Sequence, residues 1–173
     1  MIDAEKHSAF EKLRDGRRFE IRALKPEDRA SLVSAVERVG TQSLYRRFFA
    51  VRRNFTEQET DFFVNVDFVN HVALVAIADN GGRTMIVGGG RYVLIKPGKA
   101  EVAFAVIDEY QGQGVGAALM RHLTAIAREA GLEQFVAEVL SENIPMLKLF
   151  EKCGCNMSTK RDAQVVHVTL GLN

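Results

Sequence analysis

The sequence predicts a single domain of the α/β (α+β) class, with a mixed, mainly antiparallel sheet flanked by helices. Its 173 residues, 47% hydrophobic and 26% charged, suit one globular domain with a real core. Strand-like runs joined by tight turns occupy the middle of the chain, and amphipathic helical runs separate the later strands. We find no internal repeat, linker or low-complexity stretch, so we expect these elements to form one layered unit.

Bulk properties also argue against several classes of function. The net charge of +1 does not favour a dedicated nucleic-acid surface. The N-terminus has no apolar signal core, and no run of about 18 apolar residues occurs, so we expect neither export nor a membrane span. Cys153 and Cys155 are too close together to form a disulfide framework, which favours a cytoplasmic, reducing environment. These cysteines and the scattered histidines lack ligand spacing, so no metal is expected.

The first half of the chain begins with a polar, poorly patterned stretch. We expect residues 1–16 to be a loose arm or a short helix, and the domain proper to span 17–173. Residues 19–23 alternate apolar and polar side chains, as a half-buried strand does. Pro26 then begins a helix with an apolar stripe up to Val39, and Gly40 is its predicted stop.

Two further helices are predicted before the central strands. One covers residues 43–49. The next opens at Thr56, which forms a capping-box pattern with Glu59, and ends near Asn65. We expect Phe62 and Phe63 of this helix to enter the core.

Three strands joined by hairpin turns follow, at about 71–78, 84–95 and 100–107. The turn at 79–82 reads Asp-Asn-Gly-Gly, a strong hairpin signal, and Pro97-Gly98 is a second tight turn. Gly88–Gly90 in the middle strand suggests a bulge or a close backbone approach.

The last part alternates helices and strands. Apolar residues recur at helical spacing from Val115 to Ala130 and indicate a long amphipathic helix that Gly131 ends. Residues 134–140 are the next strand, and Pro145 starts another helix that runs to about Lys152. Residues 164–170 read as a final strand.

The segment from Ala100 to Ala117 carries most of the chemistry. An apolar strand with a single carboxylate, Glu101, leads through a polar turn into the glycine-rich segment 111–117. Backbone N–H groups in such a turn, continuing into a helix N-terminus, bind phosphate oxygens. A P-loop would need lysine and a hydroxyl residue after the last glycine, and Ala117 follows instead. A dinucleotide fingerprint would need a tighter turn and more βα units than the chain has left.

A third interpretation fits best. The pattern at Gln111, Gly114 and Gly116 resembles the pyrophosphate loop of the GNAT superfamily of N-acetyltransferases. The run from Asn143 to Gly154 resembles the terminal signature of that family. Residues 43–49 and 100–104 resemble the GNAT domains of bacterial protein-lysine acetyltransferases.

The resemblance implies a GNAT fold that binds acetyl-CoA, or another short acyl-CoA, where the sheet opens between residues 100–107 and 134–140. It implies direct transfer of the acyl group to a primary amine, with a protein lysine as the leading acceptor and a small amine, polyamine or amino acid as the alternative. The expected assembly is a monomer or a homodimer. The implied cofactor-binding residues are Ala105, Val106, Gln111, Gly112, Gln113, Gly114, Val115, Gly116, Ala117, Asn143 and Phe150.

Glu101 is the implied catalytic base. At the start of a strand buried on both faces it would be partly desolvated, which brings a carboxylate toward the working range of a general base. An exposed residue paired with Lys99 or an arginine is the competing interpretation. Many family members carry a glutamate at this place, and the resemblance favours the base.

Phe150 departs from the family pattern, because a tyrosine often stands there to protonate the departing thiolate. Tyr45, Tyr92 and Tyr110 are possible substitutes. A module that binds acyl-CoA as a sensor and has lost catalysis is therefore the rival hypothesis from another class.

Other polar residues have simpler interpretations. Asn143 can cap the following helix as well as bind the cofactor. The two cysteines are expected to be buried small apolar residues rather than nucleophiles, and His122 is expected to be structural. Arg46 and Arg47 form a solvated face or line the acceptor groove.

Overall fold

The structure, a computed structural model, describes residues 2–38 and 56–173. Within these ranges the helices are α1 (Arg29–Glu37), α3 (Glu57–Val64), α4 (Val115–Glu129) and α5 (Ile144–Glu151), with 3-10 turns η1 (Ala4–Lys6), η2 (Pro26–Asp28) and η3 (Asp108–Tyr110). The strands are β1 (Ser8–Lys12), β2 (Arg18–Ala23), β3 (His71–Asn80), β4 (Arg83–Lys96), β5 (Lys99–Val106), β6 (Gln134–Leu140), β7 (Asn156–Asp162) and β8 (Val165–Gly171). Among the described helices, none combines the length and the apolar character that crossing a membrane requires.

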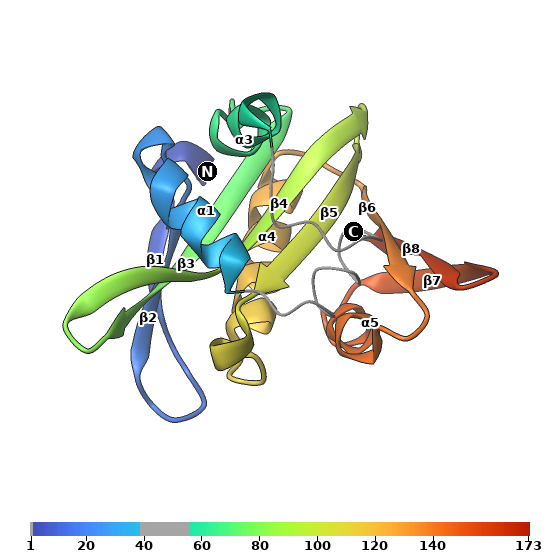
Figure 1. Ribbon diagram of the computed structural model, residues 1–173. Helices are drawn as coiled ribbons and strands as arrows, with labels where there is room; N and C mark the ends of the chain where they lie inside the picture. Colours follow the sequence, from blue (N-terminus) through green and yellow to red (C-terminus); the bar gives the residue numbers. More distant parts are fainter. Residues whose placement is uncertain (1, 39–55) are drawn as a thin grey trace.

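The described strands form one sheet in the order β1-β2-β3-β4-β5-β6-β8-β7. Only β5 and β6 are parallel among them, and the other neighbouring pairs are antiparallel. The predicted mixed, mainly antiparallel sheet is confirmed. Helices α1 and α3 lie in front of β3 and β4 in Figure 1, α4 lies behind them, and α5 sits beside the C-terminal strands.

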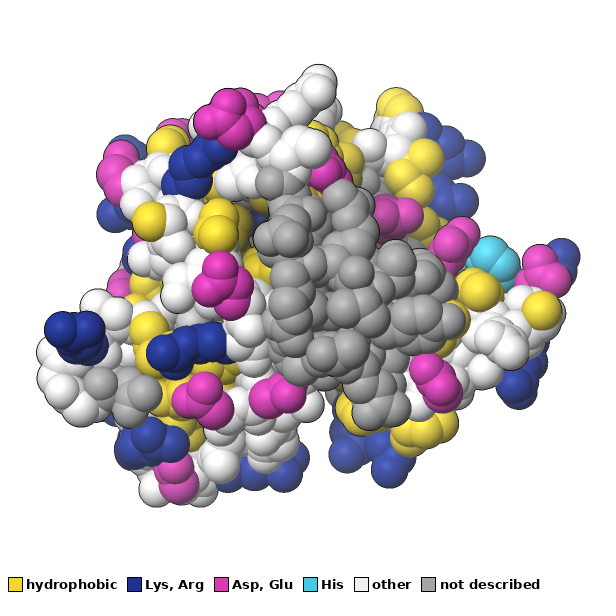
Figure 2. Space-filling model, in the orientation of Figure 1, with side chains coloured by type: hydrophobic (Ala, Val, Ile, Leu, Met, Phe, Trp, Pro, Cys, Tyr) yellow, Lys and Arg dark blue, Asp and Glu magenta, His cyan; other side chains and the backbone are white. Residues whose placement is uncertain are grey.

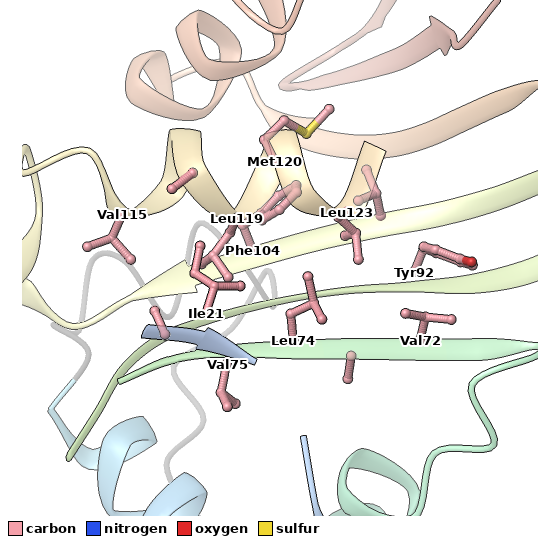
Figure 3. Close-up of a cluster of buried hydrophobic side chains, with 14 of the residues drawn as sticks. Ile21, Val72, Leu74, Val75, Tyr92, Phe104, Val115, Leu119, Met120 and Leu123 are labelled. Carbon is pink, nitrogen blue, oxygen red and sulfur yellow. The ribbon is translucent and has the colours of Figure 1, made fainter. Parts of the chain in front are cut away.

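The main core lies between α4 and the sheet. Figure 3 shows Leu119 and Leu123 of α4 pointing at the strands, while Val75 of β3 points away toward the opposite face. All three are buried. The apolar spacing in α4 therefore predicted its buried face correctly, and the helix packs against β3, β4 and β5.

The glycines of β4 let β5 and α4 pack closely against it. A Cβ on Gly90 would lie 2.7 Å from the Phe104 ring of β5, and a Cβ on Gly88 would lie 3.1 Å from both the Ala105 carbonyl oxygen of β5 and Val115 of α4. The pairing of β3 with β4 shifts between Ala76 and Ile77. Both alternatives expected from this glycine run, a bulge and a close approach, are confirmed.

Local signals for turns and caps are also confirmed. Glu59 N–H donates to Thr56 Oγ1 at 3.0 Å, and Thr56 N–H donates to the Glu59 carboxylate at 3.2 Å. Gly131 follows α4 with a φ of 82°. These caps depend only on neighbouring residues, which is why the sequence predicts them well.

Two edge strands and one aromatic residue differ from expectation. Residues 8–12, expected in a loose arm or short helix, form β1, and β7 was not predicted. In β1 the large apolar side chain, Phe10, points outward, and β7 is mostly exposed, so neither strand shows an apolar face in sequence. Phe62 is 54% exposed rather than in the core, because the buried side of α3 carries Thr60 and Val64 instead.

The strand β1 is held to α4 by polar side chains. His122 Nδ1 lies 2.8 Å from His7 Nε2, and His122 Nε2 lies 2.7 Å from Glu11 Oε2. Arg121 donates to the other Glu11 oxygen at 2.8 Å. His122 is thus structural, as expected, and it fixes the N-terminal hairpin beside the helix. The helix expected at 43–49, together with Val39 and Gly40, lies outside the described residues.

Candidate active site

The glycine segment forms the turn between η3 and α4. Gly112 and Gly114 have positive φ angles of 77° and 94°, a conformation that favours glycine. Gly114 is the N-cap of α4, so N–H groups of the first turn have no acceptor within the helix. A Cβ on either glycine would meet no atom within 4 Å. The turn therefore offers the N–H groups, the helix N-terminus and the open space that a diphosphate group needs.

The side chain of Gln111 holds this turn against the end of β5. Its Nε2 donates to the Val106 carbonyl at 3.1 Å and to Asp108 Oδ1 at 3.1 Å. On the other side, Ile107 N–H donates to the Val87 carbonyl of β4 at 2.9 Å. The turn is thus fixed by the protein itself, and Gln111 has a structural role whatever else it binds.

The sheet opens beside this turn. The parallel pairing of β5 with β6 runs from Lys99–Gln134 to Glu101–Val136 and then stops, while β4 stays paired with β5 as far as Val106. After Glu101, the edge of β5 that faces β6 therefore has no partner among the described strands, and its backbone borders the opening. Such an edge can pair with an extended ligand as it would with a strand. The opening expected between these strands is confirmed.

A cavity of about 350 Å³ lies between the glycine turn, the end of β5 and α5. Most of the residues predicted to bind the cofactor line it together, although they come from three separate elements. They are Ala105, Val106, Gln111, Gly112, Gly114, Val115, Gly116, Ala117 and Asn143.

Two of the predicted binding residues do not line the cavity. Phe150 is only 1% exposed, and its ring centroid lies 6.4 Å from that of Phe104, so it belongs to the core behind the cavity wall that Phe104 forms. Gln113 turns its side-chain oxygen into the protein, where it is buried without a hydrogen-bond partner among the described atoms. Its carbonyl accepts the Arg14 N–H at 3.1 Å.

Helix α5 forms the wall opposite the glycine turn. Asn143 is its N-cap, and Asn143 Oδ1 accepts the Met146 N–H at 3.3 Å. The capping interpretation of Asn143 is confirmed, and the residue is also buried at the cavity wall. The cap therefore fixes the helix that carries this side of the cavity.

Glu101 lies at the last paired position before β5 and β6 separate. Its side chain is exposed and does not line the cavity. The desolvation expected at this position is therefore absent, and that expectation is wrong. The strand is buried on one face only, through Ala100, Val102 and Phe104, and Glu101 belongs to the other face.

The tyrosines considered as proton donors lie in different environments. Tyr92 is buried against Phe135 with ring centroids 5.5 Å apart, and burial raises the pKa of its hydroxyl to about 12. Tyr110 lines the cavity, with the Arg17 guanidinium 5.5 Å from its ring centroid. Tyr45, Arg46 and Arg47 lie outside the described residues. Tyr110 is therefore the tyrosine that the structure places next to the candidate site.

The cysteines are less buried than the sequence predicts. Cys153 and Cys155 are free and half-buried, and both pack against the core as apolar residues do. Burial, with a further contribution from the Cys153 thiol, raises the pKa of Cys155 to about 12. Since the thiolate is the reactive form, Cys155 is poorly suited to nucleophilic chemistry.

Sequence reasoning missed three basic residues at the cavity. Arg14 comes from the turn between β1 and β2, Lys148 comes from α5, and Lys152 is the C-cap of α5. No local motif marks them, because the cavity is assembled from distant parts of the chain. The lysines carry a weak signal in their spacing of four residues, which places both on one side of a helix.

Comparison with known proteins places this geometry in a family. The sequence model of the acetyltransferase (GNAT) family matches residues 38–155. An acetyltransferase of Pseudomonas aeruginosa is 32% identical over 162 residues, which cover 91% of this chain and 86% of that protein. Acetyltransferase Pat of Mycolicibacterium smegmatis is 32% identical over 146 residues, or 82% of this chain, and these span only 42% of the length of Pat.

Solved structures agree with the sequence relatives. The crystal structure of the GNAT domain of S. lividans PAT superposes with a TM-score of 0.85 and 36% identity, covering 95% of this chain and 96% of that one. The structure of yncA, a putative acetyltransferase from Salmonella typhimurium with its cofactor acetyl-CoA, has a TM-score of 0.71 and 18% identity, covering 90% of this chain and 94% of that one. At this identity the second likeness shows a shared fold.

Proposed function

The chain belongs to the acetyltransferase (GNAT) family, and we propose that it transfers the acetyl group of acetyl-CoA directly to a primary amine, with Glu101 as the general base. The family and the names of its relatives support an acyltransferase activity. The observation that carries the proposal is the cavity beside the separating ends of β5 and β6, with a glycine turn and the N-terminus of α4 at one side. Bound there, acetyl-CoA would supply a thioester, in which the acetyl carbon is activated toward an amine.

The residues of the cavity have separate roles in this proposal. N–H groups from Gly112 to Ala117 hold the diphosphate, and the free edge of β5 at Ala105 and Val106 pairs with the amides of the pantetheine arm. This pairing aligns the arm along β5, in the direction of Glu101. The small side chain of Ala105 leaves room for the arm at the cavity wall.

Glu101 is suited to take a proton because it stands where the strands separate. It lies on the same face of β5 as Ala105, four residues earlier, or about 13 Å along the strand. At this distance the proton passes from the amine through water or through a long acceptor side chain that reaches along the strand. The amine must lose a proton because an ammonium has no lone pair with which to attack the thioester, and the carboxylate accepts it.

A protein lysine is the acceptor that we favour. An exposed Glu101 is accessible to a side chain of another protein, and one of the relatives is named Pat, in line with the resemblance to protein-lysine acetyltransferases. A small amine, polyamine or amino acid is the alternative. We further propose that the protein acts in the cytoplasm, which its two free thiols favour.

The variant Glu101→Gln tests the base. We expect acetyl transfer to fall by about 100-fold or more at pH 7.5, with acetyl-CoA affinity changed by less than about 2-fold, because the charge is lost away from the cavity. At pH 9 part of the rate should return, since more of the acceptor amine is already neutral. Release of CoA is measured across a panel of lysine peptides and metabolite amines, and binding by calorimetry.

Glu138→Gln is the matched control, since Glu138 is an exposed carboxylate on the neighbouring strand β6. It should leave both rate and affinity unchanged. Transfer that survives in Glu101→Gln at pH 7.5 would show that Glu101 is not the base.

A non-catalytic acyl-CoA sensor is the second candidate. The buried ring of Phe150 favours it, because a phenylalanine cannot donate the proton that a family tyrosine would supply. The same panel separates the two, since a sensor binds acetyl-CoA and acetylates no acceptor. Failure to bind any CoA thioester would reject both candidates.

A further inference from the structure

The cavity has an uneven distribution of charge. The whole chain is nearly neutral, with 23 basic and 22 acidic residues. The described residues that line the cavity include Arg14, Lys148 and Lys152 and no aspartate or glutamate. Figure 2 shows basic side chains on both sides of the hollow at the lower edge of the molecule. An anionic ligand would therefore find an attractive field at this opening.

The backbone of Arg14 is fixed next to the glycine turn. Its N–H donates to the Gln113 carbonyl at 3.1 Å, and the preceding residue, Leu13, is buried. The contact of Glu11 with His122 holds the same hairpin to α4. The Arg14 side chain itself is exposed, so a guanidinium group stands at the cavity on a rigid support.

Lys148 and Lys152 stand on the other side, Lys148 in the last turn of α5 and Lys152 at its C-cap. Both are exposed, and neither pairs with an acidic side chain within the described part of the chain. Basic residues near a helix C-terminus are favourable, which explains their charge. It does not explain why both border the cavity, where two like charges four residues apart repel each other. An anion between them would remove this repulsion.

We propose that Arg14, Lys148 and Lys152 bind the 3′-phosphate at the adenosine end of the acyl-CoA and make this chain selective for 3′-phosphorylated CoA thioesters. The inference rests on the proposed function. Backbone N–H groups of the glycine turn and α4 serve the diphosphate. The 3′-phosphate is a separate monoester with a charge of about −1.5 to −2 at neutral pH. It needs side-chain cations, and the forked guanidinium of Arg14 matches its oxygens.

The test compares two ligands, acetyl-CoA and acetyl-3′-dephospho-CoA, by calorimetry. We expect the wild type to bind acetyl-CoA at least about 10-fold more tightly, as a charge-assisted contact predicts. Arg14→Gln and the double variant Lys148→Gln/Lys152→Gln should each reduce this preference by weakening acetyl-CoA binding alone. All three side chains are exposed, so the melting temperature should stay the same.

Lys12→Gln and Lys160→Gln are matched controls. Each removes one exposed positive charge, from β1 and β7 respectively, and neither residue lines the cavity, so both should keep the wild-type preference. Equal wild-type affinity for the two ligands would overturn the inference and leave the proposed function intact. Variants that weaken both ligands equally, or that keep the preference, would overturn it as well. A wild type that binds neither ligand would instead reject the proposed function, and this inference with it.

Discussion

The two glycine-rich segments of this chain, Gly88–Gly90 and residues 112–116, use glycine for opposite reasons. Around Gly90 the chain is so crowded that a Cβ would lie 2.7 Å from the Phe104 ring. Around Gly112 and Gly114 a Cβ would meet nothing within 4 Å, and glycine is favoured there by a positive φ. The first segment serves packing, and the second keeps backbone N–H groups open to a ligand.

A glycine motif can therefore mark either a packed backbone or an open one. In sequence the two segments look alike, since both are short glycine runs next to apolar residues. The structure separates them by two properties, the space in front of the backbone and the sign of φ. Changes in the packed segment should therefore alter stability, and changes in the open segment should alter ligand binding.

The largest effect is expected at Gly90. Gly90→Ala should lower the free energy of unfolding by about 2–3 kcal/mol, because the new Cβ overlaps Phe104 and overpacking strains the core. Gly89→Ala should cost less, since the nearest atom to its Cβ is the Leu74 carbonyl oxygen at 3.3 Å. Urea unfolding measures both. A Gly90→Ala variant as stable as the wild type would show that close packing does not require glycine at this position.

A pH effect on stability is expected beside the same packed segment. Arg91, the residue after Gly90, lies 3.0 Å from His71 Nε2. Burial, together with the positive charge of Arg91, lowers the pKa of His71 to about 4. The folded protein keeps His71 neutral while the unfolded chain takes up a proton. The resulting stabilisation is complete above pH 6.5 and is lost as the pH falls toward 4.

The free energy of unfolding should therefore be about 2 kcal/mol lower at pH 5 than at pH 8 through this residue. His71→Gln should flatten that dependence and leave acetyl-CoA affinity at pH 7.5 unchanged, because His71 does not line the cavity. Urea unfolding at several pH values measures the slope. An identical slope in wild type and variant would show that His71 titrates alike in the folded and unfolded states.

A smaller effect on stability is expected in the open segment. Gly114→Ala and Gly131→Ala each place an alanine at a positive φ, at opposite ends of α4, and each should cost about 1–2 kcal/mol of stability. Only Gly114→Ala should also weaken acetyl-CoA binding, by about 10-fold, since its Cβ enters the space that the diphosphate needs. Equal affinities in the two variants would contradict the assignment of the glycine turn.

The sequence predicts best what depends on neighbouring residues. The cap at Thr56, the long helix with Leu119 and Leu123 on its buried face, and the glycine turn all follow from local spacing. The strands β1 and β7 were not predicted, because an edge strand is held by backbone hydrogen bonds and needs no apolar pattern.

The candidate site is predicted only in part, for a similar reason. The glycine turn and Asn143 carry motifs, and both border the cavity. The exposure of Glu101 depends on what covers one face of β5, which no local pattern reports. Arg14 joins the site only because its hairpin folds back onto α4, a contact between residues more than a hundred positions apart.

A crystal structure of the chain with acetyl-CoA would show whether the cofactor lies in the opening between β5 and β6. We predict the diphosphate on the N–H groups of residues 112–117 and the pantetheine arm along the free edge of β5. We predict the thioester on the side of Ala105 that leads toward Glu101. A diphosphate bound elsewhere, or an arm that leaves the opening between β5 and β6 empty, would contradict the account.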